Sequence, residues 1–173
     1  MKIIFMYFCY LFIAGCSIQS YQYDMAKELL VSKKNTQEIP SPNWEVNWKG
    51  IKKKVYAINS NDNVFFTDGE IIIHFDGWNI VSAKGLNYDD REIHIKNNHN
   101  NITYSVEGEF INKVACDDWE KVTLMNNSGF ERRCSKLPYS FKDLIILNNE
   151  NKLVSLEFVL IPGQPAIKIN LRY

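Results

Sequence analysis

The sequence predicts an all-β body of antiparallel strands over residues 44–173. Short segments alternate apolar and polar residues, two Asp-Gly dipeptides separate such segments, and a helical pattern is seen only at residues 24–33. A period of two is the pattern of half-buried strands, and many short strands without alternating helices are typical of antiparallel sheets. We therefore expect a meander that forms a sandwich or a partly closed barrel.

The opening strand follows a polar stretch that ends in prolines. Trp44, Val46 and Trp48 alternate with polar residues, as expected of a strand with one buried face. A second strand is expected at residues 55–58, before a turn-rich segment at 59–63.

The clearest unit consists of three strands at residues 64–67, 70–75 and 78–83, joined by Asp68-Gly69 and Asp76-Gly77. Asp-Gly between apolar runs favours a two-residue hairpin turn, whose central residues both have positive φ. The period of two then assigns the side chains of the middle strand to two faces. One face is expected to carry Ile71, Ile73 and Phe75, and the other Ile72 and His74.

The remaining strands are shorter and are separated by turn residues. The last strand alternates apolar residues, expected to point inward, with polar ones. The expected strands are residues 92–96, 102–106, 110–115, 121–125, 130–134, 144–147, 153–161 and 166–172, with a hairpin turn at 148–151.

The amino terminus has the pattern of an export signal. Lys2 precedes an apolar run over residues 3–14, which ends in Ala14-Gly15 before Cys16. A basic start, a hydrophobic stretch and small residues at a cleavage point are the parts of a secretory leader. The run is shorter than the roughly 20 residues that a spanning helix needs.

Residues 13–16 resemble the lipobox of bacterial lipoproteins. The resemblance implies that residues 1–15 are removed and that Cys16 is acylated, which leaves 158 of the 173 residues tethered to a membrane. Ser17 stands where an aspartate usually retains lipoproteins at the inner membrane, so we expect the outer membrane and a periplasmic orientation. Residues 16–43 would then form a tether with a short helix, which alternatively docks on the body.

Composition and cysteine content narrow the class of protein further. The 20 basic and 20 acidic residues cancel, whereas a nucleic-acid binder carries a strong basic excess. With Cys9 in the leader and Cys16 acylated, Cys116 and Cys134 remain as a pair. In an exported chain such a pair favours a disulfide, while a metal site would need further ligands at close spacing.

Candidate catalytic residues are scattered. None of His74, His94 and His99 forms a His-x-His pair, so a strand does not place two of them on one face. Asp89-Asp90 and Asp117-Asp118 are adjacent pairs, and adjacent strand residues point to opposite faces, so loop charge is the preferred interpretation. We expect no enzyme activity, no cofactor and no metal.

The tryptophans allow two interpretations. They either pack in the core, as is common in β domains, or offer flat surfaces on which sugar rings stack. The residues concerned are Trp44, Trp48, Trp78 and Trp119.

Residues 68–73, 76–81 and 84–86 are similar to the capsule and exopolysaccharide lipoproteins of the YjbF/GfcB type, in which a strand, a Gly turn and a second strand lead into Gly-Leu. The late segment 153–165 also resembles the last strand of that family. Residues 80–83 lack the arginine-rich form of the second strand, and the pair Cys116 and Cys134 has no counterpart in the family pattern. The resemblance implies an all-β outer-membrane lipoprotein in polysaccharide secretion.

Three functional hypotheses follow. The first is a lipid-anchored accessory or assembly protein of the envelope, with a protein or polysaccharide partner. The second is a carrier of lipid or lipoprotein with an apolar cavity, and the third is a periplasmic hydrolase. A large apolar cavity favours the carrier, and a polar cleft with clustered carboxylates or histidines favours the hydrolase.

Overall fold

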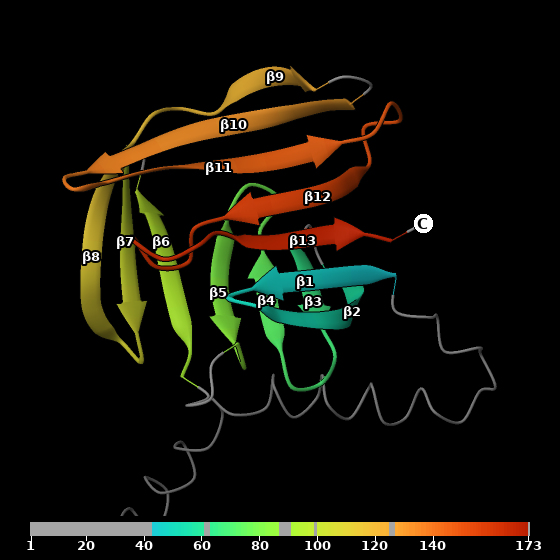
Figure 1. Cartoon of the computed structure of the whole chain (residues 1–173), viewed down its shortest axis with the longest axis horizontal. Coiled ribbons are helices and arrows are strands. Elements are labelled where there is room, and N and C mark those ends of the chain that lie inside the picture. The colour runs from blue at the N-terminus through green and yellow to red at the C-terminus, as the bar shows by residue number, and fades with distance from the viewer. Residues whose placement is uncertain (1–42, 61–62, 87–90, 99, 125–126, 173) are drawn as a thin grey trace, which may run out of the picture. The chain divides into compact units, whose positions relative to one another are not determined.

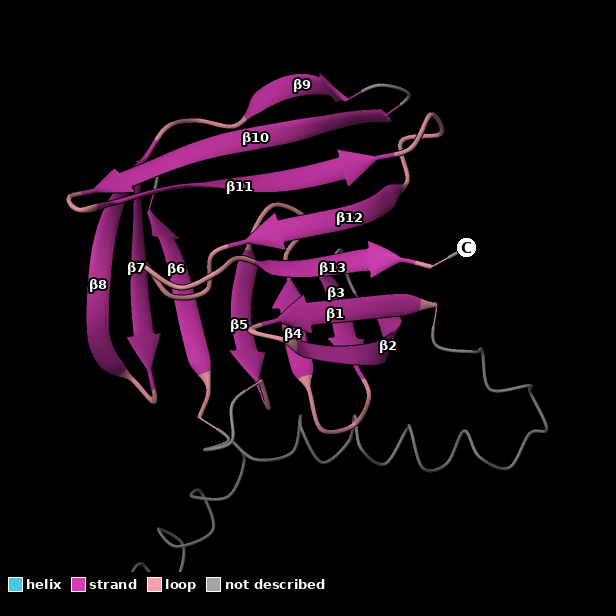
Figure 2. Cartoon of the chain, viewed as in Figure 1, coloured by secondary structure: helices cyan, strands magenta, loops and turns pink. Residues whose placement is uncertain are grey.

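The computed structural model describes residues 43–60, 63–86, 91–98, 100–124 and 127–172. These residues belong to one compact unit, which comprises residues 40–173. Strands and connecting loops account for all of the described ranges (Figure 2). The all-β fold and its antiparallel pairing are confirmed. Cys16, the expected leader and the expected helix at 24–33 lie outside the described residues.

Within the described ranges, the sheet contains thirteen strands. The strands are β1 (Trp44–Trp48), β2 (Ile51–Ser60), β3 (Asn63–Thr67), β4 (Ile72–Phe75), β5 (Ile80–Lys84), β6 (Ile93–Asn98), β7 (Asn101–Val106), β8 (Glu109–Cys116), β9 (Glu120–Leu124), β10 (Asn127–Lys136), β11 (Tyr139–Leu147), β12 (Leu153–Phe158) and β13 (Ile167–Leu171). Every expected strand has a counterpart; β2, β10 and β11 are longer than the sequence indicated, and β4 and β12 are shorter.

The strands close into a barrel. Strands β1 to β8 follow one another as a meander, β13 pairs with β1, and β10 pairs with both β11 and β8. Twelve strands therefore form a closed ring, and β9 lies outside it, paired with β10. In Figure 1, β10–β13 and β1 run nearly perpendicular to β4–β8. The expected sandwich or partly closed barrel is thus a fully closed sheet.

Alternating side chains of the strands are buried inside this barrel. On β4 and the residue before it, Ile71, Ile73 and Phe75 are buried, whereas Ile72 is exposed, as the period of two predicted. On β13, Ile167 and Ile169 are likewise buried. The largest fully buried side chains come from strands and loops around the ring and include Trp48, Phe66, Tyr104, Ile102, Leu156 and Leu160.

The two Asp-Gly turns form hairpins by a different geometry from the one expected. Of the dipeptide residues, only Gly69 and Gly77 have positive φ, at 98° and 95°. Four residues separate the paired strand ends in each hairpin, because Thr67 pairs with Ile72 and Phe75 with Ile80. The prediction of a two-residue turn was wrong, although the hairpins themselves are confirmed.

An aspartate side chain organises each of these turns. Asp68 Oδ1 accepts hydrogen bonds from the backbone N–H groups of Glu70 (2.9 Å) and Ile71 (2.7 Å). Burial opposes ionisation of Asp68, but these donors and the charge of Lys53 outweigh it and lower the pKa of the carboxyl. The aspartate thus supplies the turn with the hydrogen bonds that a two-residue loop would take from its backbone.

The disulfide lies where the barrel closes. Cys116 and Cys134 occupy paired positions on β8 and β10 and are joined by a bond of 2.08 Å, in agreement with the prediction from the cysteine count. Only Ser135 and Ala115 add a second pair to this ladder.

In the ranges that the structure describes, there is no helix long and apolar enough to cross a membrane.

Candidate functional site

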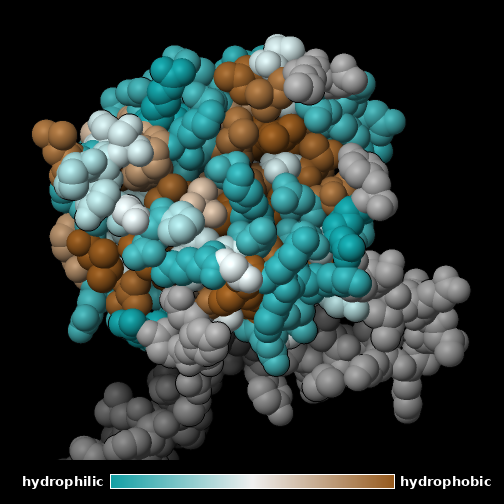
Figure 3. Space-filling view, viewed as in Figure 1, coloured by the Kyte–Doolittle hydropathy of each residue, from teal (hydrophilic) through white to brown (hydrophobic). Residues whose placement is uncertain are grey.

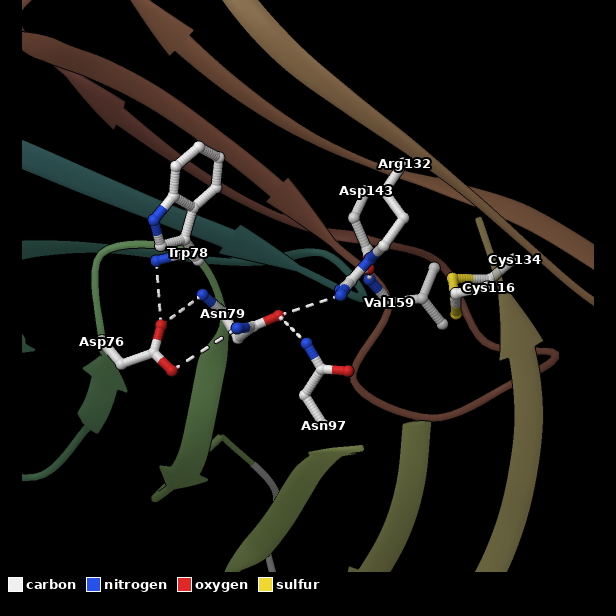
Figure 4. A network of polar contacts seen from close by, with 9 residues as sticks. All are labelled: Asp76, Trp78, Asn79, Asn97, Cys116, Arg132, Cys134, Asp143 and Val159. Atoms are coloured by element: carbon white, nitrogen blue, oxygen red, sulfur yellow. Dashed lines mark hydrogen bonds and ion pairs between the residues drawn. A yellow bond between two sulfur atoms is a disulfide. The ribbon is translucent and has the colours of Figure 1, made fainter. Parts of the chain in front are cut away.

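The turn between β4 and β5 is the centre of the candidate site (Figure 4). Asp76 Oδ1 accepts hydrogen bonds from the backbone N–H groups of Trp78 (2.8 Å) and Asn79 (2.6 Å). This repeats the arrangement at Asp68 and fixes the direction of the next two side chains. Trp78 and Asn79 consequently leave the turn in defined orientations, and Asn79 points toward β10.

A buried ion pair lies beside this turn. Arg132 on β10 and Asp143 on β11 are directly opposite in the register, and Arg132 Nη2 donates to Asp143 Oδ2 at 2.7 Å. The two residues are 3% and 1% exposed. Asp143 Oδ1 also accepts from the Val159 N–H at 3.1 Å, and Arg132 Nη1 donates to Asn79 Oδ1 at 2.9 Å. Side-chain hydrogen bonds therefore join β10, β11 and the β4–β5 turn across the barrel.

Burial controls the electrostatics of this network. Desolvation raises the pKa of the Asp143 carboxyl, and it outweighs the opposing attraction of Arg132. Burial, followed by the nearby Asp143 carboxylate, also raises the pKa of the Tyr104 hydroxyl. The Trp119 ring covers the guanidinium, with Arg132 Cζ 4.5 Å from the ring centroid. Because the two charged groups bond to each other and are shielded from solvent, we assign the pair a structural role.

Aromatic side chains surround the same end of the barrel. Trp78 contacts Phe130 in an edge-to-face arrangement at 4.9 Å, and Trp119 lies 6.0 Å from both Trp78 and Phe158. Trp44 and Trp48 are core residues, while Trp78 is 45% exposed. Of the two interpretations of the tryptophans, core packing holds for Trp44 and Trp48. Trp119 is half-buried against the core, and Trp78 is the most exposed of the four.

The candidate catalytic residues do not converge within the described ranges. His74 Nε2 lies 2.8 Å from Asn63 Oδ1, and the His74 ring stacks on Phe65. His94 Nε2 lies 3.7 Å from Glu92 Oε2. Asp117 and Asp118 are exposed, whereas His99 and Asp89-Asp90 lie outside the described residues. Among the described side chains, no group of three or more His, Cys, Asp or Glu is close enough to hold a metal ion.

An open groove with a mainly apolar surface and several polar residues in its lining lies beside the turn, between β5 and β6. Its volume is about 310 Å³, at the lower end of the range for small-molecule sites. It is therefore large enough for a small ligand. The lining residues are Asp76, Asn79, Val81, His94, Ile95, Lys96 and Asn97.

Sequence reasoning missed the residues that build this region. Arg132, Asp143 and Asn79 were not singled out, because Arg132-Arg133 and Lys142-Asp143 have the appearance of solvated charge in the sequence. The alternation of Phe130, Arg132 and Cys134 on one face of a strand was the available signal, since it places an arginine between two inward-facing side chains.

The described residues form a closed all-β barrel with a hydrogen-bonded β4–β5 turn and an open groove in its wall. Comparison with family models, curated proteins and solved structures finds no match to this chain.

Proposed function

We propose that this chain is a lipid-anchored accessory protein of the bacterial envelope, tethered through Cys16 to the outer membrane and facing the periplasm. The similarity of residues 13–16 to a lipobox supports the anchor. In this proposal the barrel acts by binding a partner taking part in the export of surface polysaccharide, and it performs no chemistry of its own.

The observation that carries the binding role is the open groove in the wall of the closed barrel. The Arg132–Asp143 pair and its bond to Asn79 hold the β4–β5 turn at the rim of that groove. A site on such a supported turn keeps its geometry without a ligand, which favours binding by preorganisation.

The link to polysaccharide export is supported by the family resemblance. Residues 68–86 carry most of that resemblance, and they form the two hairpin turns, β4 and β5. The segment that resembles the capsule lipoproteins therefore also supplies Asp76, Asn79 and Val81 to the groove.

A second surface supports contact with an envelope protein. Phe110 on β8 is 65% exposed, and Leu137 in the β10–β11 turn is 97% exposed. A side-chain contact between Lys136 and Asn112 brings the two segments together. On the face seen in Figure 3, hydrophobic residues are likewise exposed among hydrophilic ones. Clustered exposed apolar side chains favour protein contacts.

The proposal is tested first at the anchor. Cells expressing the parental chain, Cys16→Ala or Cys9→Ala are labelled with a fatty-acid analogue and separated into membrane and soluble fractions. Cys16→Ala should lose the label and accumulate as an unprocessed precursor, because the thioether-forming thiol is absent. Cys9→Ala is the matched control and should behave as the parent, since residue 9 lies in the expected leader.

A Cys16→Ala chain that is still labelled and membrane-bound would overturn the anchor. The polysaccharide part has its own test in the organism that produces the chain. Deleting the gene should reduce surface polysaccharide, and the parental chain should restore it, whereas Cys16→Ala should not. Unchanged polysaccharide in the deletion strain would contradict this part of the proposal.

A further inference from the structure

Strands β5 and β6 are paired only at one end. Their ladder consists of Ser82 with His94 and Ala83 with Ile93. Continuing the register would pair Val81 with Ile95, but no such pair forms, and the groove opens at this point. The groove is thus a split between two neighbouring strands of the barrel wall.

A bulge in β5 accounts for the split. Phe75 pairs with Ile80 and His74 with Ser82, so Val81 is the extra residue on β5. A bulged strand bends and twists more strongly, and bulges often lie next to binding sites. The bend carries β5 away from β6, and the facing backbone edges of Val81 and Ile95 border the groove without pairing with each other.

The far end of the split is closed. Asn97 Nδ2 on β6 donates to Asn79 Oδ1 at 3.2 Å, and Asn79 is held in turn by Arg132. An inserted peptide strand would need β5 and β6 to be about 9–10 Å apart along its whole length, twice the normal strand spacing. The short, closed split excludes such a strand and favours a compact ligand.

The lining side chains indicate the chemistry of that ligand. Asp76 contributes a carboxylate and Asn79 and Asn97 contribute carboxamides, which also bond to the turn, to each other and to Arg132. His94 adds an imidazole and Lys96 an ammonium group, and both residues are exposed. One carboxylate and one permanent cation form a mixed set of donors and acceptors, whereas an anion site would gather several cations. Hydroxyl groups act as both donors and acceptors, so they match such a set.

The lining of the groove also has an apolar part. Val81 and Ile95 belong to the lining, Val81 is half-buried and Ile95 is buried. A sugar ring combines hydroxyls at its edge with an apolar C–H face, which is the combination that this lining offers. We propose that the β5–β6 split binds one sugar residue of a polysaccharide. This proposal rests on the proposed function and assigns it a binding site.

The test uses the acylated chain as purified from membranes in detergent, labelled with nitrogen-15 for NMR. The probes are methyl glycosides of glucose, galactose, N-acetylglucosamine and glucuronic acid, and oligosaccharides released by mild acid from the surface polysaccharide of the producing cells. Inorganic phosphate serves as the anion probe. At least one saccharide should shift the backbone amides of Val81, Ile95 and Asn97.

Two variants locate the site. Val81→Trp fills the groove and should weaken saccharide binding at least tenfold, whereas Ile58→Trp, at an exposed position on β2, should leave it unchanged. Should Val81→Trp fail to fold, the double variant of exposed residues, His94→Ala with Lys96→Ala, should show the same loss.

The inference is overturned by shifts confined to other residues, by the absence of shifts with every saccharide, by binding of phosphate alone, or by unchanged affinity in the groove variants. These outcomes are separate from a failure of the anchor. Missing acylation of Cys16 would refute the proposed tether while leaving the saccharide titration as it stands.

Discussion

Replacing Asp143 with alanine should be among the most destabilising single changes in this barrel. The substitution removes the acceptor of Arg132 Nη2 at 2.7 Å and of the Val159 N–H at 3.1 Å. Arg132, which is 3% exposed, would keep only the Asn79 oxygen and the Trp119 ring as partners. Breaking a buried ion pair by removing one partner costs about 3–5 kcal/mol. That is a large part of the roughly 5–15 kcal/mol that stabilises a domain.

The assay is urea denaturation followed by tryptophan fluorescence, with the free energy of unfolding taken from the midpoint and slope. The matched control is Glu157→Ala, which breaks the exposed Lys168–Glu157 pair of 3.1 Å and should change stability by less than about 1 kcal/mol. A double variant, Arg132→Met with Asp143→Leu, should lose less than Asp143→Ala, because no buried charge remains unpaired.

The reasoning would be refuted if Asp143→Ala lowered the free energy of unfolding by no more than the exposed control. It would also be refuted if the double variant were less stable than Asp143→Ala. Either result would mean that the guanidinium finds solvent or another partner, and that the turn carrying Asn79 is not held by this network.

Three further changes test other parts of the fold. Replacing Cys116 and Cys134 with serine should cost about 3 kcal/mol, because the bond closes a loop with a sequence separation of 18; denaturation under oxidising and reducing conditions measures the loss. Gly85→Ala should destabilise far more than Gly50→Ala in thermal melts. Both residues have positive φ, but a Cβ at Gly85 would lie 2.1 Å from a carbonyl oxygen, whereas the space at Gly50 is open. Asp68→Asn keeps the turn acceptor and removes the charge. Because the pKa of Asp68 is lowered in the folded state, the ionised carboxylate stabilises the fold above the unfolded pKa of 3.8, and this stabilisation is lost as pH falls through the folded pKa. The melting temperature of the variant should therefore decrease less on acidification than that of the parental chain.

Local pattern was sufficient to predict most strands. The alternation at Ile71, Ile73 and Phe75 gave the correct buried face, and the Asp-Gly dipeptides gave the correct hairpins. The turn geometry was misjudged because Asp68 bonds through its side chain, which makes a four-residue loop as favourable as a two-residue one.

Long-range pairing was beyond the sequence pattern. Strand β11 begins at Tyr139, whereas the expected strand began at residue 144. Residues 139–143 were not predicted as strand because Lys142 and Asp143 have the appearance of a polar segment. Their inclusion follows from the register with β10, where Asp143 faces Arg132. The ring closes where β8 pairs with β10, and this closure depends on contacts between distant residues that local periodicity does not encode. The same is true of the site, because Arg132 on β10 bonds to Asn79.

The central claim is that the barrel is tethered by a lipid on Cys16, and intact mass spectrometry of the chain purified from membranes tests it most directly. The account predicts a mature polypeptide that begins at residue 16 and carries the added mass of a diacylglyceryl group, with or without an acyl group on its amino terminus. A chain that retains Met1, or one that begins at residue 16 with an unmodified thiol, would contradict it.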